Sequence, residues 1–210
     1  MSTTSVLAPG TTAARSTPVV VAAGAKIRLG LYQGGLGAPA ASALSTTAGG
    51  TLAATTYFVR TTYVTPAGET TAAAETSLAA ALDTVLNVAS PPAAGAGAQT
   101  ATGWNVYVST ATGTETKQNA SPIAIGTAWV EPIGGLIAGS ALPSADTTGG
   151  GLPQGGVDCS VETLNPDGAT HTPTGLTLST RNPSITIDVP GSYTVLRPTT
   201  SGLVGVVSDT

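Results

Sequence analysis

The sequence predicts an all-β protein made of short strands. Residues 56–70 and 103–110 alternate β-branched and aromatic side chains and end in turn residues, as strands with a buried face do. The chain has 27 Gly and 15 Pro, which disfavour long helices. Threonine occurs in nearly every segment, which favours strands. Bulky core residues are scarce, with one Phe, two Trp and one Met, so we expect stacked small layers.

The N-terminal third contains one unpatterned segment and one strand-forming segment. Residues 1–16 are polar and rich in Ala and Thr, and we expect an extended N-terminal arm. Residues 17–32 read as two short strands interrupted at Ala22–Gly24. The second strand alternates apolar residues with Lys26 and Arg28, as a half-solvated strand does.

The C-terminal third also consists of predicted short strands. Asn165-Pro166-Asp167-Gly168 is a strong turn signal, because Pro fixes φ at its second position and Gly closes it. The spacing of strands at roughly 8 to 12 residues is typical of a sandwich or small barrel. The expected strands are 157–163, 176–178, 184–189, 193–196 and 203–207.

Two linkers predict an insertion. Residues 33–50 and 146–156 are rich in Gly, and they flank the block that holds the two strongest strand signals. We therefore expect an inserted β-sandwich at residues 36–150, linkers included. The parent β-domain, a small sandwich or barrel, would combine residues 17–35 and 151–210 from both chain ends.

Residues 72–86 leave two alternatives open. Leu78, Leu82 and Leu86 are spaced by four in an Ala-rich segment, which favours a helix. In an all-β context a strand pair with a bend near Asp83-Thr84 fits equally well. Further along the insert, residues 110–118 predict a polar hairpin tip.

Composition excludes several classes of function. Charged residues are 9% of the chain, and seven Lys and Arg against a net charge of -4 argue against nucleic-acid binding. With no apolar run of about 18 residues and no signal-peptide pattern, we expect no membrane association. Cys159 is the single cysteine, so an internal disulfide is excluded.

Residues 57–70, 103–110 and Ala128-Trp129-Val130-Glu131-Pro132 together resemble the fibronectin type III-like, Ig-like inserts of tailed-phage virion proteins. The resemblance covers about half of the chain. In an ordinary fibronectin domain the Trp-bearing strand precedes the Tyr-rich strand, whereas here Trp104 follows Tyr57. The resemblance implies a sandwich and leaves its strand order open.

The flanking segments resemble the small β-domains of phage head-decoration and head-fibre proteins. The likeness rests on the strand break at Ala22–Gly24, on Pro190-Gly191 leading through Tyr193 to Arg197, and on the terminal residues 204–206. It implies a virion protein, assembled in the host bacterial cytoplasm, that binds the major capsid protein or another virion protein. A homo-oligomer, with a trimer as one form, would suit a capsid lattice.

The sequence offers no catalytic constellation, so we expect a protein that is not an enzyme and carries no cofactor. His171 is the only histidine, and in a polar connection it predicts a solvated side chain. Cys159 alternates with Val157 and Val161, which predicts a small buried hydrophobe. The carboxylates of the insert, Glu69, Glu75, Asp83, Glu115 and Glu131, lie on different turns and give no hydrolase-like pair.

The acids of the parent domain are candidates for a metal site. Asp158, Glu162, Asp167 and Asp188 would have to gather at one end of the sheet to bind Ca²⁺. The repeated Asp pattern of a calcium loop is missing, so we expect a solvated rim and no metal.

Four aromatic side chains of the insert are candidates for a surface on which a sugar ring could stack. Trp104 shares a face with Val106 and Val108, which predicts that it fills the core. Tyr107 lies on the opposite face and is the candidate for an exposed contact. The others are Tyr57 and Trp129.

These expectations define two functions that differ in location. The first is a non-enzymatic protein that decorates or cements the capsid and projects the insert outward. The second is a tail or fibre accessory protein that binds host-surface glycan. A hydrolase carried on the virion is a third class, which would require clustered carboxylates in a cleft.

Overall fold

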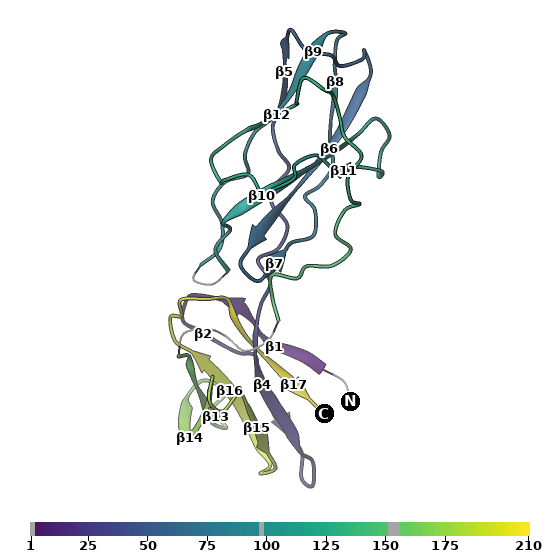
Figure 1. The fold of residues 1–210 in the computed structure, drawn as a ribbon. Coiled ribbons are helices and arrows are strands. Elements are labelled where there is room, and N and C mark those ends of the chain that lie inside the picture. The colour runs from purple at the N-terminus through teal and green to yellow at the C-terminus, as the bar shows by residue number, and fades with distance from the viewer. Residues whose placement is uncertain (1–2, 97–98, 151–155) are drawn as a thin grey trace. The chain divides into compact units, whose positions relative to one another are not determined.

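The computed structural model describes residues 3–96, 99–150 and 156–210, and this part of the chain folds into antiparallel β-sheets without an α-helix (Figure 1). The all-β prediction is therefore confirmed. The chain divides into two compact units. Unit 1 contains Met1–Gly34 and Gly149–Thr210, and unit 2 contains Gly35–Gly95 and Gln99–Thr148. Each unit has a hydrophobic core of its own.

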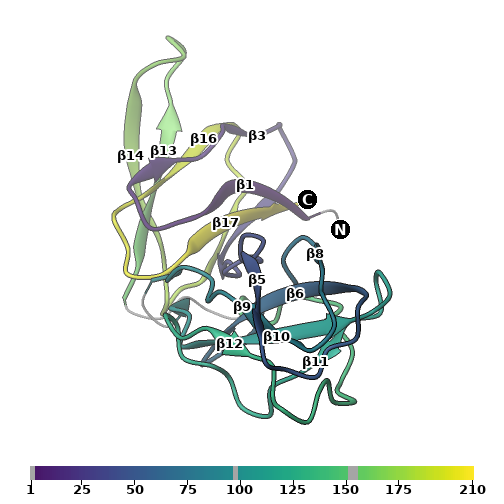
Figure 2. The ribbon, with the colours of Figure 1, turned by 90° about the horizontal axis from the view of Figure 1, so that it is seen from above.

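Unit 1 contains two antiparallel sheets that enclose one core. The first has the order β1 (Thr3–Gly10), β17 (Val204–Asp209), β4 (Ile27–Gln33) and β15 (Ser184–Ile187). The second has the order β14 (His171–Ser179), β13 (Asp158–Leu164), β16 (Gly191–Arg197) and β2 (Ala14–Arg15), and β3 (Val19–Val21) also pairs with β16. Figure 2 shows the β13–β14 hairpin extending past its neighbouring strands. The buried core residues include Leu29, Leu31, Cys159, Val161, Leu178, Val195, Val204 and Val206.

The strand break predicted in residues 17–32 is where the chain changes sheet. β3 pairs with β16 in the second sheet, whereas β4 pairs with β17 and β15 in the first. The turn between β3 and β4 has the Ala25 amide donating to the Ala22 carbonyl at 3.0 Å. Gly24 adopts a φ of 78°, a left-handed conformation that glycine reaches without steric cost.

The prediction of an N-terminal arm at residues 1–16 is wrong for the described residues. Thr3–Gly10 forms β1, which pairs with the last strand in a register that joins Thr3 to Asp209. Val6 and Leu7 are buried in the unit 1 core. The polar composition concealed this strand because β1 is an edge strand with irregular pairing, so little of it alternates.

Unit 2 contains two further antiparallel sheets. The larger has the order β11 (Thr116–Lys117), β10 (Gly103–Ser109), β6 (Thr56–Thr65) and β7 (Gly68–Glu69), with β8 (Thr76–Ala79) also on β6. The smaller has the order β12 (Trp129–Val130), β9 (Thr84–Val88) and β5 (Leu44–Ala48). The core residues include Tyr57, Val59, Leu86, Val88, Trp104, Val106, Val108 and Trp129.

Residues 72–86 contain strand β8 and the start of strand β9, and no helix. β8 and β9 are joined by a tight turn in which Asp83 adopts a φ of 58°. Aspartate tolerates this left-handed conformation because its short polar side chain bonds locally. Of the two alternatives, the strand pair bent near Asp83-Thr84 is the one that forms. The leucine spacing favoured a helix, but pairing with β6 and β5 outweighs local propensity.

The two predicted linkers are more ordered than their composition indicates. Residues 33–50 contain β5, which pairs with β9 along its whole length. In the second linker, the Thr147 amide donates to the Glu69 carbonyl at 2.9 Å, which ties the chain to β7. Residues 151–155 of that linker lie outside the described residues.

Candidate functional site

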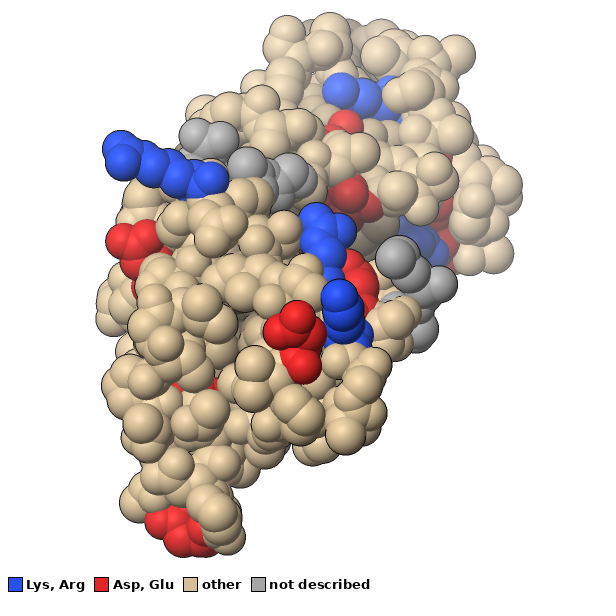
Figure 3. Space-filling view, turned by 90° about the horizontal axis from the view of Figure 1, so that it is seen from below, with Lys and Arg blue, Asp and Glu red and all other residues tan. Residues whose placement is uncertain are grey.

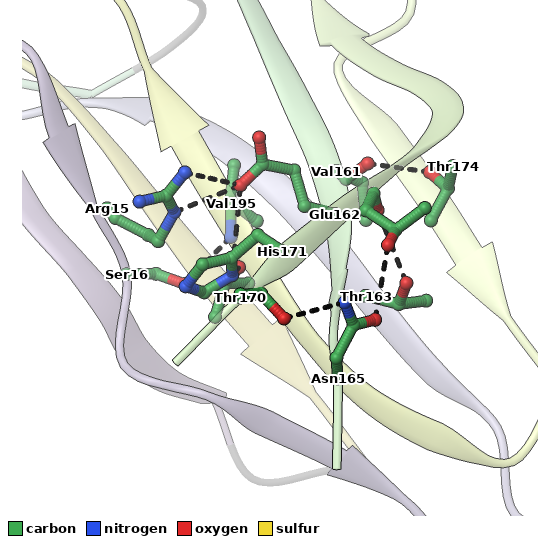
Figure 4. Close-up of polar contacts among 12 residues, drawn as sticks. Arg15, Ser16, Val161, Glu162, Thr163, Asn165, Thr170, His171, Thr174 and Val195 are labelled. Carbon is green, nitrogen blue, oxygen red and sulfur yellow. Dashed lines mark hydrogen bonds and ion pairs between the residues drawn. The ribbon is translucent and has the colours of Figure 1, made fainter. Parts of the chain in front are cut away.

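A polar cluster of unit 1 forms where β2, β13, β14 and β16 lie side by side (Figure 4). Glu162 of β13 pairs in register with Thr194 of β16. Two guanidinium nitrogens of Arg15 bond Glu162 Oε2, Nε at 2.9 Å and Nη2 at 2.8 Å. His171 Nδ1 lies 3.0 Å from Thr194 Oγ1 and 3.9 Å from Glu162 Oε2.

This cluster lacks the geometry of a catalytic triad. A triad uses one imidazole nitrogen for the nucleophile and the other for the carboxylate. Here the Thr194 hydroxyl and the Glu162 carboxylate both lie at Nδ1, and Thr194 is buried. The arrangement braces four strands against one another. The predicted solvated loop histidine is wrong, because His171 begins β14 and its side chain is largely buried.

The acids considered for calcium do not form a metal site. Glu162 is engaged by Arg15, and Asp167 accepts bonds from the Ala169 and Thr170 amides at 3.0 Å and 2.9 Å. The Thr170 hydroxyl and these two amides lower the pKa of Asp167 to about 2. Across residues 3–96, 99–150 and 156–210, no group of three or more His, Cys, Asp or Glu could hold a metal ion.

Cys159 is fully buried in the unit 1 core, as its alternation with Val157 and Val161 predicts. Burial raises the pKa of its thiol to about 11. A thiol that stays protonated at neutral pH is a poor nucleophile. The residue therefore acts as a small hydrophobe.

Tyr107, the predicted exposed contact, is only 1% exposed, so that prediction is wrong. Its hydroxyl donates to Glu69 Oε1 at 2.8 Å. The same oxygen accepts bonds from Thr62 Oγ1 at 2.5 Å and Asn105 Nδ2 at 2.7 Å. Burial and the adjacent carboxylate raise the pKa of Tyr107. The phenol therefore serves as an internal donor and is not available to a ligand.

The other aromatic candidates are also buried. Trp104 is fully buried, which confirms its predicted core position, and its Nε1 donates to the Thr127 carbonyl at 3.1 Å. Tyr57 and Trp129 belong to the same core. These four side chains therefore do not form a surface on which a sugar ring could stack.

The structure brings together two carboxyls that the sequence placed on separate turns. Glu75 precedes β8, Glu115 lies in the β10–β11 hairpin, and Arg60 of β6 lies between them. Burial raises the pKa of Glu115, whereas a hydrogen bond from Glu115 lowers the pKa of Glu75. The proximity of Glu75 and Glu115 could have been predicted only from the register of β6 with β8 and β10.

Exposed apolar side chains are the clearest contact candidates. In unit 2, Ile133 is 89% exposed, and Thr51 Oγ1 donates to its carbonyl at 3.3 Å. Leu82, at the turn before β9, and Val130 of β12 are also exposed.

Unit 1 also exposes two apolar side chains at one end of β16. Val20 of β3 pairs in register with Ser192, and Val189 precedes Gly191 by two residues. Both valines are more than half exposed. We call Val20 and Val189 the unit 1 patch.

The chain has few charged residues, 9% of the sequence. Mostly uncharged residues cover the face in Figure 3, with some acids and bases side by side near its middle. Two depressions of unit 1 measure about 140 and 320 Å³, and neither is lined by His171. Their lining residues are Ala13, Ser160, Leu196, Arg197 and Pro198 in the first, Gly156, Ser179, Thr180 and Arg181 in the second, and Asp158 in both.

Comparison of the chain with protein-family models, with curated proteins and with solved structures finds no match. In the part of the chain that the structure describes, no helix has the length and hydropathy needed to cross a membrane. Function must therefore be inferred from the arrangement of the residues themselves.

Proposed function

We propose that the protein is a non-enzymatic structural component of a tailed-phage virion that attaches through unit 1 and displays unit 2. The observation that carries the proposal is the contrast between polar and apolar side chains. His171, Glu162, Glu69 and Tyr107 are engaged in internal bonds, whereas large apolar side chains are exposed in both units. Exposed apolar side chains with few surrounding charges suit docking on another protein.

The chain's topology supports attachment through one unit and display of the other. The β1–β17 pair brings both described chain ends into a single sheet of unit 1. Unit 2 begins and ends at adjacent points, since the Leu36 amide donates to Thr148 Oγ1 at 2.8 Å. An insert with close ends can be carried by a loop without disturbing the parent domain.

Mass action is the proposed mechanism of stabilisation. A protein that binds an assembled lattice and not its dissociated subunits stabilises the lattice by RT ln(1 + [L]/Kd). Repeated copies, as monomers or as a trimer, would add avidity. The partner on this reading is the major capsid protein or another virion protein.

The alternative of a glycan-binding tail or fibre accessory has less support. Its aromatic contact was Tyr107, which is buried against Glu69. Sugar binding by stacking needs an accessible ring face, and Trp104, Trp129 and Tyr57 are buried as well.

A cryo-EM difference map between particles with and without the chain tests the location. The proposal expects regularly spaced density on the head lattice that is missing when the chain is absent. Density missing from the tail, with the head unchanged, would transfer the protein to the accessory class. Identical maps would remove the virion assignment.

Substitution of the unit 1 patch tests which unit attaches. We expect Val20→Ser with Val189→Ser to weaken binding to particles that lack the chain by about tenfold or more, because buried valines each contribute roughly 1.5 kcal/mol or more. Ile133→Ser in unit 2 is the matched control and should bind normally. Exposed sites change stability by about 0.5 kcal/mol or less, so all variants should fold. Weaker binding by the control alone would assign attachment to unit 2.

A further inference from the structure

The β10–β11 hairpin is fastened to the segment ahead of β8 by carboxylate bonds. Glu75 Oε1 and Oε2 accept from Thr112 Oγ1 at 2.8 Å and 3.0 Å, and Glu75 Oε2 accepts from the Gly113 amide at 3.0 Å. Both donors belong to the turn of the hairpin. Glu75 is therefore the contact that holds this turn to residues 71–75.

A second carboxyl lies behind the first. The Gly113 amide also reaches Glu115 Oε1 at 3.3 Å, so one amide serves both acids. The Glu115 side chain is 0% exposed, whereas Glu75 retains 20% exposure. A fully buried carboxylate is costly unless a cation or several donors compensate it.

One guanidinium faces both acids. Arg60 Nη2 lies 3.9 Å from Glu75 Oε2, and Arg60 Nε lies 3.7 Å from Glu115 Oε1. Within the described residues Arg60 is the cation at ion-pair distance from either carboxyl. Two ionised acids against one cation would leave an uncompensated negative charge at a buried position.

The bonding of Glu115 fits a neutral acid. Its Oε2 is buried, and within the described residues no donor reaches it. A protonated carboxyl needs no donor because it donates itself, and the nearby acceptor is the Glu75 carboxylate, which shares the Gly113 amide with Glu115. Like-charged carboxyls that share a site take up one proton between them.

We propose that Glu75, Glu115 and Arg60 form a proton-operated clasp that holds the hairpin while the two acids share one proton and loosens it when both are ionised. In the closed form Glu115 is neutral and donates to Glu75, and Arg60 balances the single negative charge. Loss of the shared proton as the pH rises puts two carboxylates beside one guanidinium. The turn at Thr112-Gly113 is the element that this repulsion releases.

The two directions of shift define the pH window. The raised pKa of Glu115 means that its contribution is present at low pH and is lost as the pH rises through its folded value. The lowered pKa of Glu75 means that its contribution is present above its unfolded value and is lost as the pH falls through its folded value. The clasp is therefore tightest between these two limits.

NMR of the full chain between pH 3 and pH 9 tests the clasp through the Gly113 amide. In the wild type we expect its chemical shift to move at an upper midpoint, and its exchange to accelerate there by about tenfold or more beyond the general trend. Glu115→Gln keeps a neutral donor at all pH values and should abolish the upper transition. Glu75→Gln should weaken protection of Gly113 throughout.

Asp83→Asn is the matched control, because Asn also tolerates the left-handed backbone of that turn. It should leave the pH dependence of the chemical shift and of the exchange rate of the Gly113 amide unchanged. The carboxyl carbon shift of Glu115 in the wild type supplies a readout that does not depend on any variant. A Glu115 carbon that titrates at the ordinary glutamate midpoint, or an upper Gly113 transition that persists in Glu115→Gln, would overturn the proposal.

Discussion

The two units both bury charged side chains, but they compensate these charges in different ways. In unit 1 the buried charges are the Arg197 guanidinium, which donates to backbone carbonyls, and the Glu162 carboxylate, which pairs with Arg15. In unit 2 the charged groups compensated inside the fold are carboxyls, the buried Glu115 and Glu131 and the half-buried Glu69. Their partners are mostly hydroxyl, amide and phenol donors.

The bonds that Arg197 makes should therefore not depend on pH, whereas the bonds made by buried carboxyls should. An arginine stays protonated at any pH that a protein survives, so the bonds of Arg197 persist through titration. A buried carboxyl gains or loses its charge within the working range of pH. The raised pKa values of Glu115 and Glu131 indicate that a rise in pH above about 4.3 should lower the stability of unit 2.

The distribution of tryptophan makes the comparison measurable. Trp104 and Trp129 both lie in unit 2, and the chain has no other tryptophan. Tryptophan fluorescence therefore reports unfolding of unit 2, whereas far-ultraviolet circular dichroism reports both units.

Removing Arg197 should have the largest effect. Its Nη1 donates to the Ala8 carbonyl at 2.8 Å, and its Nε and Nη2 donate to the Thr12 carbonyl at 3.1 Å and 2.9 Å. Arg197→Met leaves these carbonyls without the guanidinium and removes its bonds between β16 and residues 8–12. We expect unit 1 to lose about 3–5 kcal/mol of unfolding free energy.

Urea denaturation with the two optical probes checks this expectation. Circular dichroism should show an early transition in Arg197→Met, and the tryptophan transition should keep the wild-type midpoint. If the tryptophan transition moved as far as the early one, the units would unfold together and the comparison would fail.

Removing the Tyr107 hydroxyl should have an intermediate effect, confined to unit 2. A hydrogen bond to a charged group contributes about 1.5–3 kcal/mol, and Tyr107→Phe deletes one of the three donors to Glu69 Oε1. Tyr63→Phe is the control, because Tyr63 donates to a neutral acceptor, the Pro92 carbonyl, at 2.8 Å. We expect about 1 kcal/mol for the control. Equal losses in the tryptophan-monitored melts would mean that the charge of Glu69 adds nothing.

The strands of the unit 2 core could be predicted because their pattern is local. Residues 56–65 and 103–109 form strands as predicted, and Trp104, Val106 and Val108 share the face that lies in the hydrophobic core. The turn at residues 165–168 also follows from its own residues, with the Gly168 amide donating to the Asn165 carbonyl at 2.9 Å. Such features depend on neighbours in sequence.

The errors concern contacts between residues far apart in sequence. Alternation placed Tyr107 on the face opposite Trp104 correctly, but it could not show that Glu69 and Thr62 bury that face. Likewise, the pairing of β1 with β17 joins residues at the two ends of the chain. The meeting of Glu75 with Glu115 depends on two strand registers, which no local pattern records.

Substitution of Glu131 should have the smallest effect and sharpens the comparison through pH. Glu131 Oε2 accepts from the Leu86 amide at 3.2 Å, and within the described residues Oε1 is buried without a donor. Burial raises the pKa of Glu131, so the unfolded chain ionises first as the pH rises above about 4.3. The stability of unit 2 should therefore fall between that pH and the folded pKa.

Glu131→Gln cannot ionise, so it should lack this part of the fall. We expect the tryptophan-monitored unfolding free energy of Glu131→Gln, relative to wild type, to rise between pH 4 and pH 7. The difference between variant and wild type cancels the titration of the other acids. Asp83→Asn should show no such rise. A variant profile parallel to that of wild type would mean that Glu131 titrates alike in both states, and that burying a carboxyl without a cation does not by itself make unit 2 sensitive to pH.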